Sequence, residues 1–228
     1  MTIRVGLLDS GVGEALNTAV LEQKSFQLSE SGDVVSATSI GDVTGHGTLI
    51  AQLILSTTPE IKLLSARVFS EQGTSTPATV AAGLDWLIEA GVGLACMSFG
   101  LHADRPVLEQ SCRRASRAGV ILVAAAPARG DPVYPAAYDN VIAVTGDARC
   151  EPGEFSHLQS ERAKFGACAY PADVTAGVPG SSGASLAAAY AVREAAAFLS
   201  SHPDAQSADF VRHLTSLCRY HGAERRTG

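Results

Sequence analysis

A chain of 228 residues, 46% hydrophobic and 18% charged, has the composition of a globular protein and is long enough for one substantial core. Its net charge of −6 gives no reason to expect nucleic-acid binding. No apolar run reaches the ~18 residues that a membrane-spanning helix needs, so no membrane interaction is expected.

Apolar runs alternate with helical stretches along the whole chain. In chain order the pattern predicts a strand over 3–9, a helix over 47–56, a strand over 61–69, a helix over 77–90, a strand over 92–98, a helix over 106–118, strands over 120–126 and 141–145, and helices over 184–200 and 207–218. Repeated strand–helix units predict an α/β fold with a mainly parallel central sheet covered on both faces. We expect a single domain over 1–218 and a frayed polar tail over 219–228.

The cysteines and the N-terminus bear on the compartment. Five cysteines, an odd number with no CxxC pair, favour reduced thiols. Met1-Thr2 leads directly into the first strand, without the charged and apolar regions of a signal peptide. A cytoplasmic protein is therefore expected. Metal-ligand spacing and clustered acidic loops are also missing from the sequence, so we expect no metal and no cofactor.

Three short motifs each place a reactive side chain beside glycine or another small residue. A serine hydroxyl needs an adjacent base to act as a nucleophile, and histidine has a suitable pKa. A buried carboxylate then orients the imidazole and stabilises the imidazolium. The motifs are Leu8-Asp9-Ser10-Gly11, Gly45-His46-Gly47-Thr48 and Gly183-Ala184-Ser185-Leu186-Ala187. Asp9 is the candidate orienting acid, His46 the base and Ser185 the nucleophile.

The predicted elements place these residues where chemistry commonly occurs. Asp9 closes the first strand, and His46 and Ser185 each open a helix. Sites in open α/β sheets gather at the carboxyl ends of the strands. A helix start also offers free N–H groups, so the Ser185 backbone N–H is a candidate donor to an oxyanion. A dinucleotide-binding loop at 11–16 is disfavoured, because Leu16 occupies the third glycine position.

The Asp-His-Ser order and the motifs resemble the subtilisin family of serine proteases. Stretches over 96–100, 118–126 and 134–144 extend the resemblance over most of the chain. It implies a subtilisin-like three-layer fold and a serine endopeptidase that forms an acyl-enzyme on Ser185. It also assigns substrate-binding positions, which are Ser98, Phe99, Gly100, Ala124, Ala126 and Val133. Gly100 is expected to let a peptide backbone approach closely.

Two departures from the family concern the oxyanion site and the first specificity pocket. Ala128 falls where relatives have an asparagine that donates to the oxyanion. Either the enzyme is slow and relies on the Ser185 N–H alone, or another donor such as Arg129 substitutes, or the protein binds peptides without cleaving them. Val133 falls where many relatives have glycine, and its extra volume predicts a preference for glycine, alanine or serine at P1.

A dedicated processing role fits these features better than broad digestion. The layout is similar to short maturation proteases that trim leader peptides, including that of the quinohemoprotein amine dehydrogenase system. The expected partner is a polypeptide substrate, such as one precursor protein. The alternative is a catalytically weak or inactive peptide-binding protein or maturation chaperone.

Overall fold

The computed structural model of the chain describes residues 2–39, 41–56, 60–158, 160–171 and 183–222. The strands are β1 (Ile3–Asp9), β2 (Gly11–Val12), β3 (Val20–Leu28), β4 (Val34–Thr38), β5 (Gly41–Asp42), β6 (Ile61–Arg67), β7 (Leu94–Met97), β8 (Ile121–Ala125), β9 (Ile142–Gly146), β10 (Phe155–His157), β11 (Phe165–Ala167) and β12 (Cys218–His221). The helices are η1 (Glu14–Leu16, a 3₁₀ helix), α1 (His46–Leu55), α2 (Pro77–Glu89), α3 (Pro106–Arg117), α4 (Ala184–Ser201) and α5 (Ser207–Leu217).

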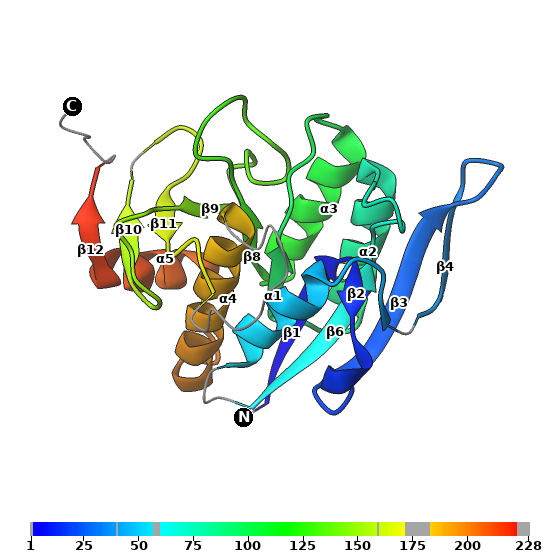
Figure 1. Cartoon of the computed structure of the whole chain (residues 1–228), viewed down its shortest axis with the longest axis horizontal. Coiled ribbons are helices and arrows are strands. Elements are labelled where there is room, and N and C mark those ends of the chain that lie inside the picture. The colour runs from blue at the N-terminus through cyan, green and yellow to red at the C-terminus, as the bar shows by residue number, and fades with distance from the viewer. Residues whose placement is uncertain (1, 40, 57–59, 159, 172–182, 223–228) are drawn as a thin grey trace.

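A single large sheet runs through the molecule in the order β12-β10-β11-β9-β8-β7-β1-β6-β3-β4 (Figure 1). Its centre is parallel: β1 pairs with β6 and β7, β7 with β8, and β8 with β9. Antiparallel pairs occur nearer the two ends, at β3–β4 and β10–β11. Helices cover both faces, as parallel sheets require. The expected three-layer α/β fold with a mainly parallel sheet is confirmed.

Alternating residues of the central strands divide the core into two clusters. On β1, Leu7 packs into the cluster that contains buried residues of α1 and α4, and Leu8 into the cluster that contains those of α2 and α3. Because both faces are covered, these strands read as continuous apolar runs, and this is why their positions could be predicted. The predicted helices also lie within a residue or two of the observed ones.

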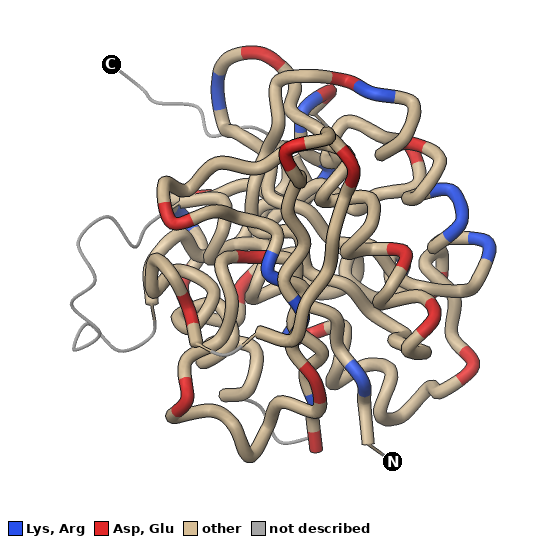
Figure 2. The backbone as a smooth tube through the Cα atoms, turned by 90° about the vertical axis from the view of Figure 1, so that its right-hand side faces the viewer, with Lys and Arg blue, Asp and Glu red and all other residues tan. Residues whose placement is uncertain are grey.

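The β3–β4 hairpin was not predicted from the sequence. Charged and polar residues interrupt its apolar pattern, because β4 is an edge strand whose side chains are mostly exposed. Phe26 of β3 nevertheless packs on Trp86 of α2, with ring centroids 5.9 Å apart. At this end of the molecule, acidic and basic positions are interspersed (Figure 2).

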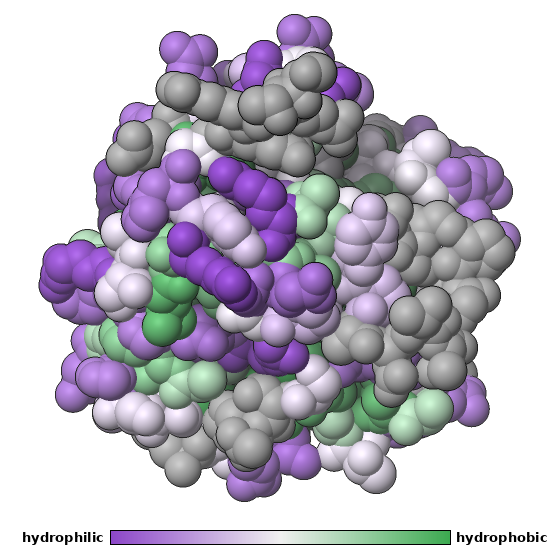
Figure 3. Space-filling view, turned by 60° about the vertical axis from the view of Figure 1, so that its left-hand side comes forward, coloured by the Kyte–Doolittle hydropathy of each residue, from purple (hydrophilic) through white to green (hydrophobic). Residues whose placement is uncertain are grey.

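The prediction of a tail over 219–228 is wrong for its first residues. Residues 218–221 form β12, which pairs in parallel with β10. The polar composition indicated a frayed end, but the pairing partner lies about sixty residues earlier and leaves no local signal. Figure 3 turns the left-hand side of Figure 1, where β12 lies, toward the viewer. On that side, hydrophilic residues surround separate hydrophobic patches. None of the described helices is both long and apolar enough to cross a membrane.

Candidate active site

Asp9 and His46 form a hydrogen-bonded pair at the carboxyl edge of the sheet. Asp9 ends β1 with 2% of its surface exposed, and His46 begins α1. The His46 Nδ1 atom lies 2.8 Å from Asp9 Oδ1 and 3.0 Å from Oδ2. Because an ionised carboxylate only accepts hydrogen bonds, Nδ1 carries the proton and Nε2 is left for another partner. The hydrogen bond to Asp9 raises the pKa of His46 above its usual value, although burial acts to lower it.

The start of α1 is held by Asp42, which sequence analysis missed. Its carboxylate accepts hydrogen bonds from the backbone N–H groups of Thr44, Gly45 and Thr48 and from the Thr48 hydroxyl. It also accepts from the Ser10 hydroxyl at 2.7 Å. An aspartate just before a helix start is a capping signal and could have identified this residue. Burial raises the pKa of Asp42, but the hydrogen bonds outweigh it and the pKa is lowered.

The glycines on either side of His46 serve two different purposes. Gly45 has a φ of 82°, in the left-handed region that favours glycine, and it allows the sharp entry into α1. A Cβ atom at Gly47 would lie 2.1 Å from the carbonyl oxygen of Gly11, so no larger residue fits. The helix therefore packs directly on the turn after β1, and this brings His46 to Asp9.

The Ser185 hydroxyl donates to the backbone carbonyl oxygen of Ser98 at 2.8 Å. Ser185 is the second residue of α4, and Ser98 follows the carboxyl end of β7. No hydrogen bond joins Ser185 to His46 in the structure, so the expected pairing of nucleophile and base stays a prediction. The Ser185 amide N–H belongs to the first helical turn, where no earlier carbonyl of the helix can accept it.

A cleft of about 220 Å³ opens beside the Asp9–His46 pair. Phe69 and Phe99 form one apolar part of it, with their rings edge to face and their centroids 5.2 Å apart. The cleft is lined by Asp9, Ser10, Thr44, His46, Phe69, Gly73, Ser98 and Phe99. Ser98 and Phe99, for which the sequence predicts substrate contact, thus line this cleft. Phe69 and Gly73 were missed, although the carboxyl end of the neighbouring strand β6 was a place to look for them.

Two of the predicted substrate-binding residues are packed away from this cleft. Ala124 and Ala126 are 0% and 1% exposed and lie in the core beneath α2 and α3. A Cβ atom at Gly100 would lie 2.4 Å from Val133 Cγ2. Val133 thus occupies the space where a side chain at residue 100 would lie, but Gly100 is itself exposed, and its close approach to a peptide backbone stays a prediction. Val133 is itself 8% exposed, and its influence on the P1 residue stays a prediction.

The segment after β8 carries the two residues that bear on the oxyanion site. Ala128 and Arg129 are both exposed, and Ala128 has no side-chain donor. Arg129 makes no hydrogen bond or ion pair with the part of the chain that the structure describes. A contribution of Arg129 to an oxyanion site therefore stays a prediction.

The chain is similar in sequence to several known proteases. The chain is 26% identical over 233 residues to "Subtilisin DY" of Bacillus licheniformis, covering 94% of this chain and 82% of that protein. It is 31% identical over 180 residues to the "Major intracellular serine protease" of Bacillus subtilis (strain 168), covering 70% of this chain and 56% of that protein. It is 30% identical to "Alkaline elastase YaB" of Bacillus sp. (strain YaB), and spans 39% of that protein's length.

Solved structures show the same fold. "S41 Psychrophilic Protease" superposes with a TM-score of 0.71 at 19% identity, over 94% of this chain and 82% of the other. A cold-adapted subtilisin-like serine proteinase gives 0.70 at 21% identity, over 94% and 81%. The sequence model of the subtilase family matches residues 2–217. The chain belongs to the subtilase family and is a subtilisin-like serine endopeptidase.

Proposed function

We propose that Asp9, His46 and Ser185 form the catalytic triad of this endopeptidase. The observation that carries the proposal is the short hydrogen bond between His46 Nδ1 and the buried Asp9 carboxylate. It orients the ring, selects the tautomer with a free Nε2 and stabilises the imidazolium that forms when His46 accepts a proton.

The Ser185 hydroxyl has to change its partner before it can react. It now donates to the Ser98 carbonyl, which lies in the segment where an extended peptide is expected to pair. A peptide N–H that takes over this carbonyl would free the hydroxyl to donate to His46 Nε2. Ser185 Oγ then attacks the scissile carbonyl carbon while His46 takes the proton. The Ser185 amide N–H stabilises the oxyanion, and His46 returns the proton to the leaving amine as the C–N bond breaks.

The substrate that we propose is one precursor polypeptide, processed in the cytoplasm. Ala128 removes the oxyanion donor that a fast digestive enzyme would use. Five free cysteines and a relative named as an intracellular protease support the compartment. Trimming of a leader peptide, as by the maturation protease of the quinohemoprotein amine dehydrogenase system, is the specific form of this role.

A fluorophosphonate probe tests the nucleophile, because it reacts only with an activated serine. We expect the wild-type protein to be labelled and Ser185→Ala to remain unlabelled. Ser200→Ala is the matched control, because Ser200 lies on the same helix and, among the described residues, its hydroxyl donates only to the Ala197 carbonyl. If folded wild-type protein shows no labelling, the proposed triad is wrong. The alternative function, a non-catalytic peptide-binding protein or maturation chaperone, would then be favoured.

The processing role is tested in cells. We expect a strain that lacks this gene to accumulate one or a few uncleaved small proteins, identified by mass spectrometry. Re-expression of the wild-type protein should remove them, whereas Ser185→Ala should not. A general change in peptide turnover without a defined precursor would contradict a dedicated role.

A further inference from the structure

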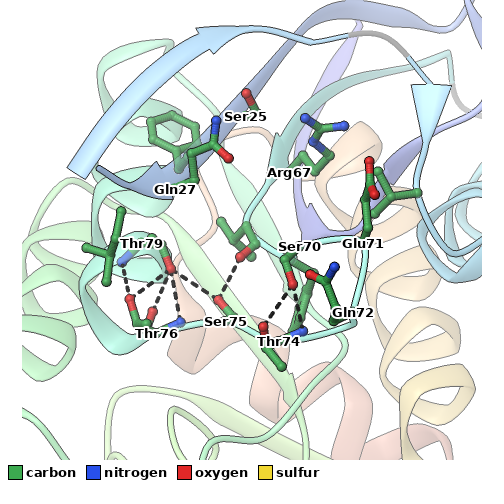
Figure 4. Close-up of a pocket in the computed structure, with 15 residues that line it drawn as sticks. Ser25, Gln27, Arg67, Ser70, Glu71, Gln72, Thr74, Ser75, Thr76 and Thr79 are labelled. Carbon is green, nitrogen blue, oxygen red and sulfur yellow. Dashed lines mark hydrogen bonds between the residues drawn. The ribbon is translucent and has the colours of Figure 1, made fainter. Parts of the chain in front are cut away.

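Figure 4 shows a second hollow, of about 480 Å³. Strand β3, the end of β6 and the segment from Val68 to Thr79 line it. We call it the Arg67 pocket, after the one Lys or Arg among its lining residues. Phe69 lines both this pocket and the cleft that contains His46. A polypeptide bound in the cleft therefore passes close to the pocket.

The Arg67 guanidinium has no hydrogen bond or ion pair within the described residues, although the side chain is half-buried. Among the described residues, three other basic side chains also lack a polar partner. These are Arg117, Arg129 and Lys164, and all three are exposed to water. A guanidinium stays charged at every physiological pH, so partial burial without a counter-charge is unfavourable. An anion that enters the pocket would remove this cost.

The other polar groups of the pocket indicate which anion fits. Hydroxyl and amide side chains line the same pocket, and Figure 4 draws Arg67 between Gln27 and Glu71 in that view. Part of the wall is already organised, because the Ser70 and Thr74 hydroxyls bond to each other at 2.8 Å. One arginine together with neutral donors matches a single carboxylate, which a guanidinium binds through two parallel hydrogen bonds. The lining also includes one acid, Glu71, which opposes any bound anion. A polyanion such as nucleic acid would in addition need several cations, whereas Arg67 can still hold a single carboxylate.

We propose that the Arg67 pocket is an accessory subsite that takes an Asp or Glu side chain of the polypeptide substrate, a few residues from the scissile bond. The subsite rests on the proposed proteolytic function and adds a means of selecting one precursor. The main chain would be held along Ser98 and Phe99, and the acidic side chain would identify the sequence.

The test uses quenched fluorescent decapeptides of alanine, glycine and serine. In each peptide a single Glu stands at a different position, on either side of the scissile bond, and each has a Gln-matched partner. At one position we expect wild-type kcat/KM to be about tenfold higher for Glu than for Gln, a difference of ~1.4 kcal/mol. Added salt should reduce this ratio, because Arg67 is partly exposed.

Variants of Arg67 then identify the charge that is responsible. Arg67→Gln should bring the Glu-to-Gln ratio close to one, Arg67→Lys should keep part of it, and Arg67→Glu should favour a Lys peptide at that position. Arg117→Gln is the matched control, because Arg117 is an exposed arginine on α3, and this variant should retain the wild-type ratio. Glu71→Gln should increase the ratio, because a second carboxylate no longer faces the substrate.

Binding separates this proposal from the proposed function. Fluorescence anisotropy of the same peptides with Ser185→Ala measures recognition without cleavage. Preferential binding of the Glu peptide, without any cleavage by wild-type protein, would support the subsite and contradict the triad. Equal kcat/KM for Glu and Gln at every position would overturn the subsite, and so would a Glu preference that survives Arg67→Gln. A Glu preference that Glu71→Gln lowers would also overturn it.

Discussion

Two carboxylates act on His46 at the scale of single residues. The hydrogen bond that His46 donates to Asp9 raises the pKa of His46, burial lowers it, and the charges of Asp9 and Asp42 raise it further. Together these effects hold the pKa of His46 above its usual value of 6.5. A general base must be neutral to accept a proton, so this balance determines the pH range in which the enzyme works.

The first prediction concerns the pH profile of cleavage. We expect kcat/KM to rise with pH, with its midpoint above 6.5, because His46 must lose a proton before Ser185 can react. Asp9→Asn should greatly lower the rate and move the midpoint to lower pH, since the hydrogen bond and charge that hold the proton are removed. A wild-type midpoint below 6.5 would contradict a His46 base paired with Asp9.

The second prediction concerns Asp42. Asp42→Asn places an NH₂ group where an oxygen now accepts hydrogen bonds, and it should cost about 1 kcal/mol of unfolding free energy in urea at pH 7. The depressed pKa of Asp42 stabilises the fold above its ordinary value of 3.8, and this contribution is lost as pH falls through the lower folded pKa. The difference from wild type should therefore narrow below pH 4.

Asp139→Asn is the control for this experiment, because Asp139 is exposed and no hydrogen bond holds its side chain in the described structure. It should leave the unfolding free energy within a few tenths of a kcal/mol. An Asp42 variant as stable as this control at pH 7 would show that the bonds to Asp42 do not hold the start of α1.

At the scale of elements, β12 extends the sheet beyond the segment that the subtilase family model matches. That match ends at residue 217, and β12 begins at Cys218. Besides pairing with β10, this end is held by the Gly222 N–H, which donates to the His157 carbonyl at 2.9 Å. Arg149 donates to the Gly222 carbonyl at 2.9 Å and also holds the buried Asp147. The strand is thus connected to the interior.

The third prediction concerns a truncated protein that lacks β12. A chain that ends at Leu217 should lose about 2–4 kcal/mol of unfolding free energy, because several hydrogen bonds disappear and the edge of β10 is uncovered. A chain that ends at Gly222 is the reference, since it keeps β12. Urea unfolding of the two proteins measures the difference. Equal midpoints would show that β12 contributes nothing to stability.

At the scale of the whole molecule, all five cysteines are free, and four of them are buried. Burial raises the pKa of Cys96, of Cys112 and of Cys150 to about 12, and that of the more accessible Cys218 to about 11. The thiolate is the reactive form, so little of it exists at neutral pH. The fold therefore gains no stability from a disulfide among these residues.

The fourth prediction follows from the state of the thiols. Iodoacetamide at pH 8 should modify Cys218 first and leave Cys96 and Cys112 largely unmodified in the native protein, as mass spectrometry would show. In urea all five should react at similar rates. The melting temperature should be the same with and without a reductant. Rapid native modification of Cys96 would contradict its burial.

The sequence predicted those features whose signal lies in residues that are neighbours along the chain. The central strands and the helices could be predicted, because burial on both faces leaves apolar runs and helical periodicity in the sequence. The positions of Asp9, His46 and Ser185 at a strand end and at two helix starts could also be predicted. The motifs pointed to the family, which the match over residues 2–217 confirms.

Tertiary structure alone decided which distant groups meet. Ser185 donates to Ser98, 87 residues earlier in the chain, and Val133 fills the space beside Gly100. Arg67 is left without a described counter-charge in a pocket whose walls come from separate segments. A residue's own neighbours determine its secondary structure and which of its faces is buried. The partner of a polar atom depends instead on how remote segments pack together, and no local pattern of residues records that.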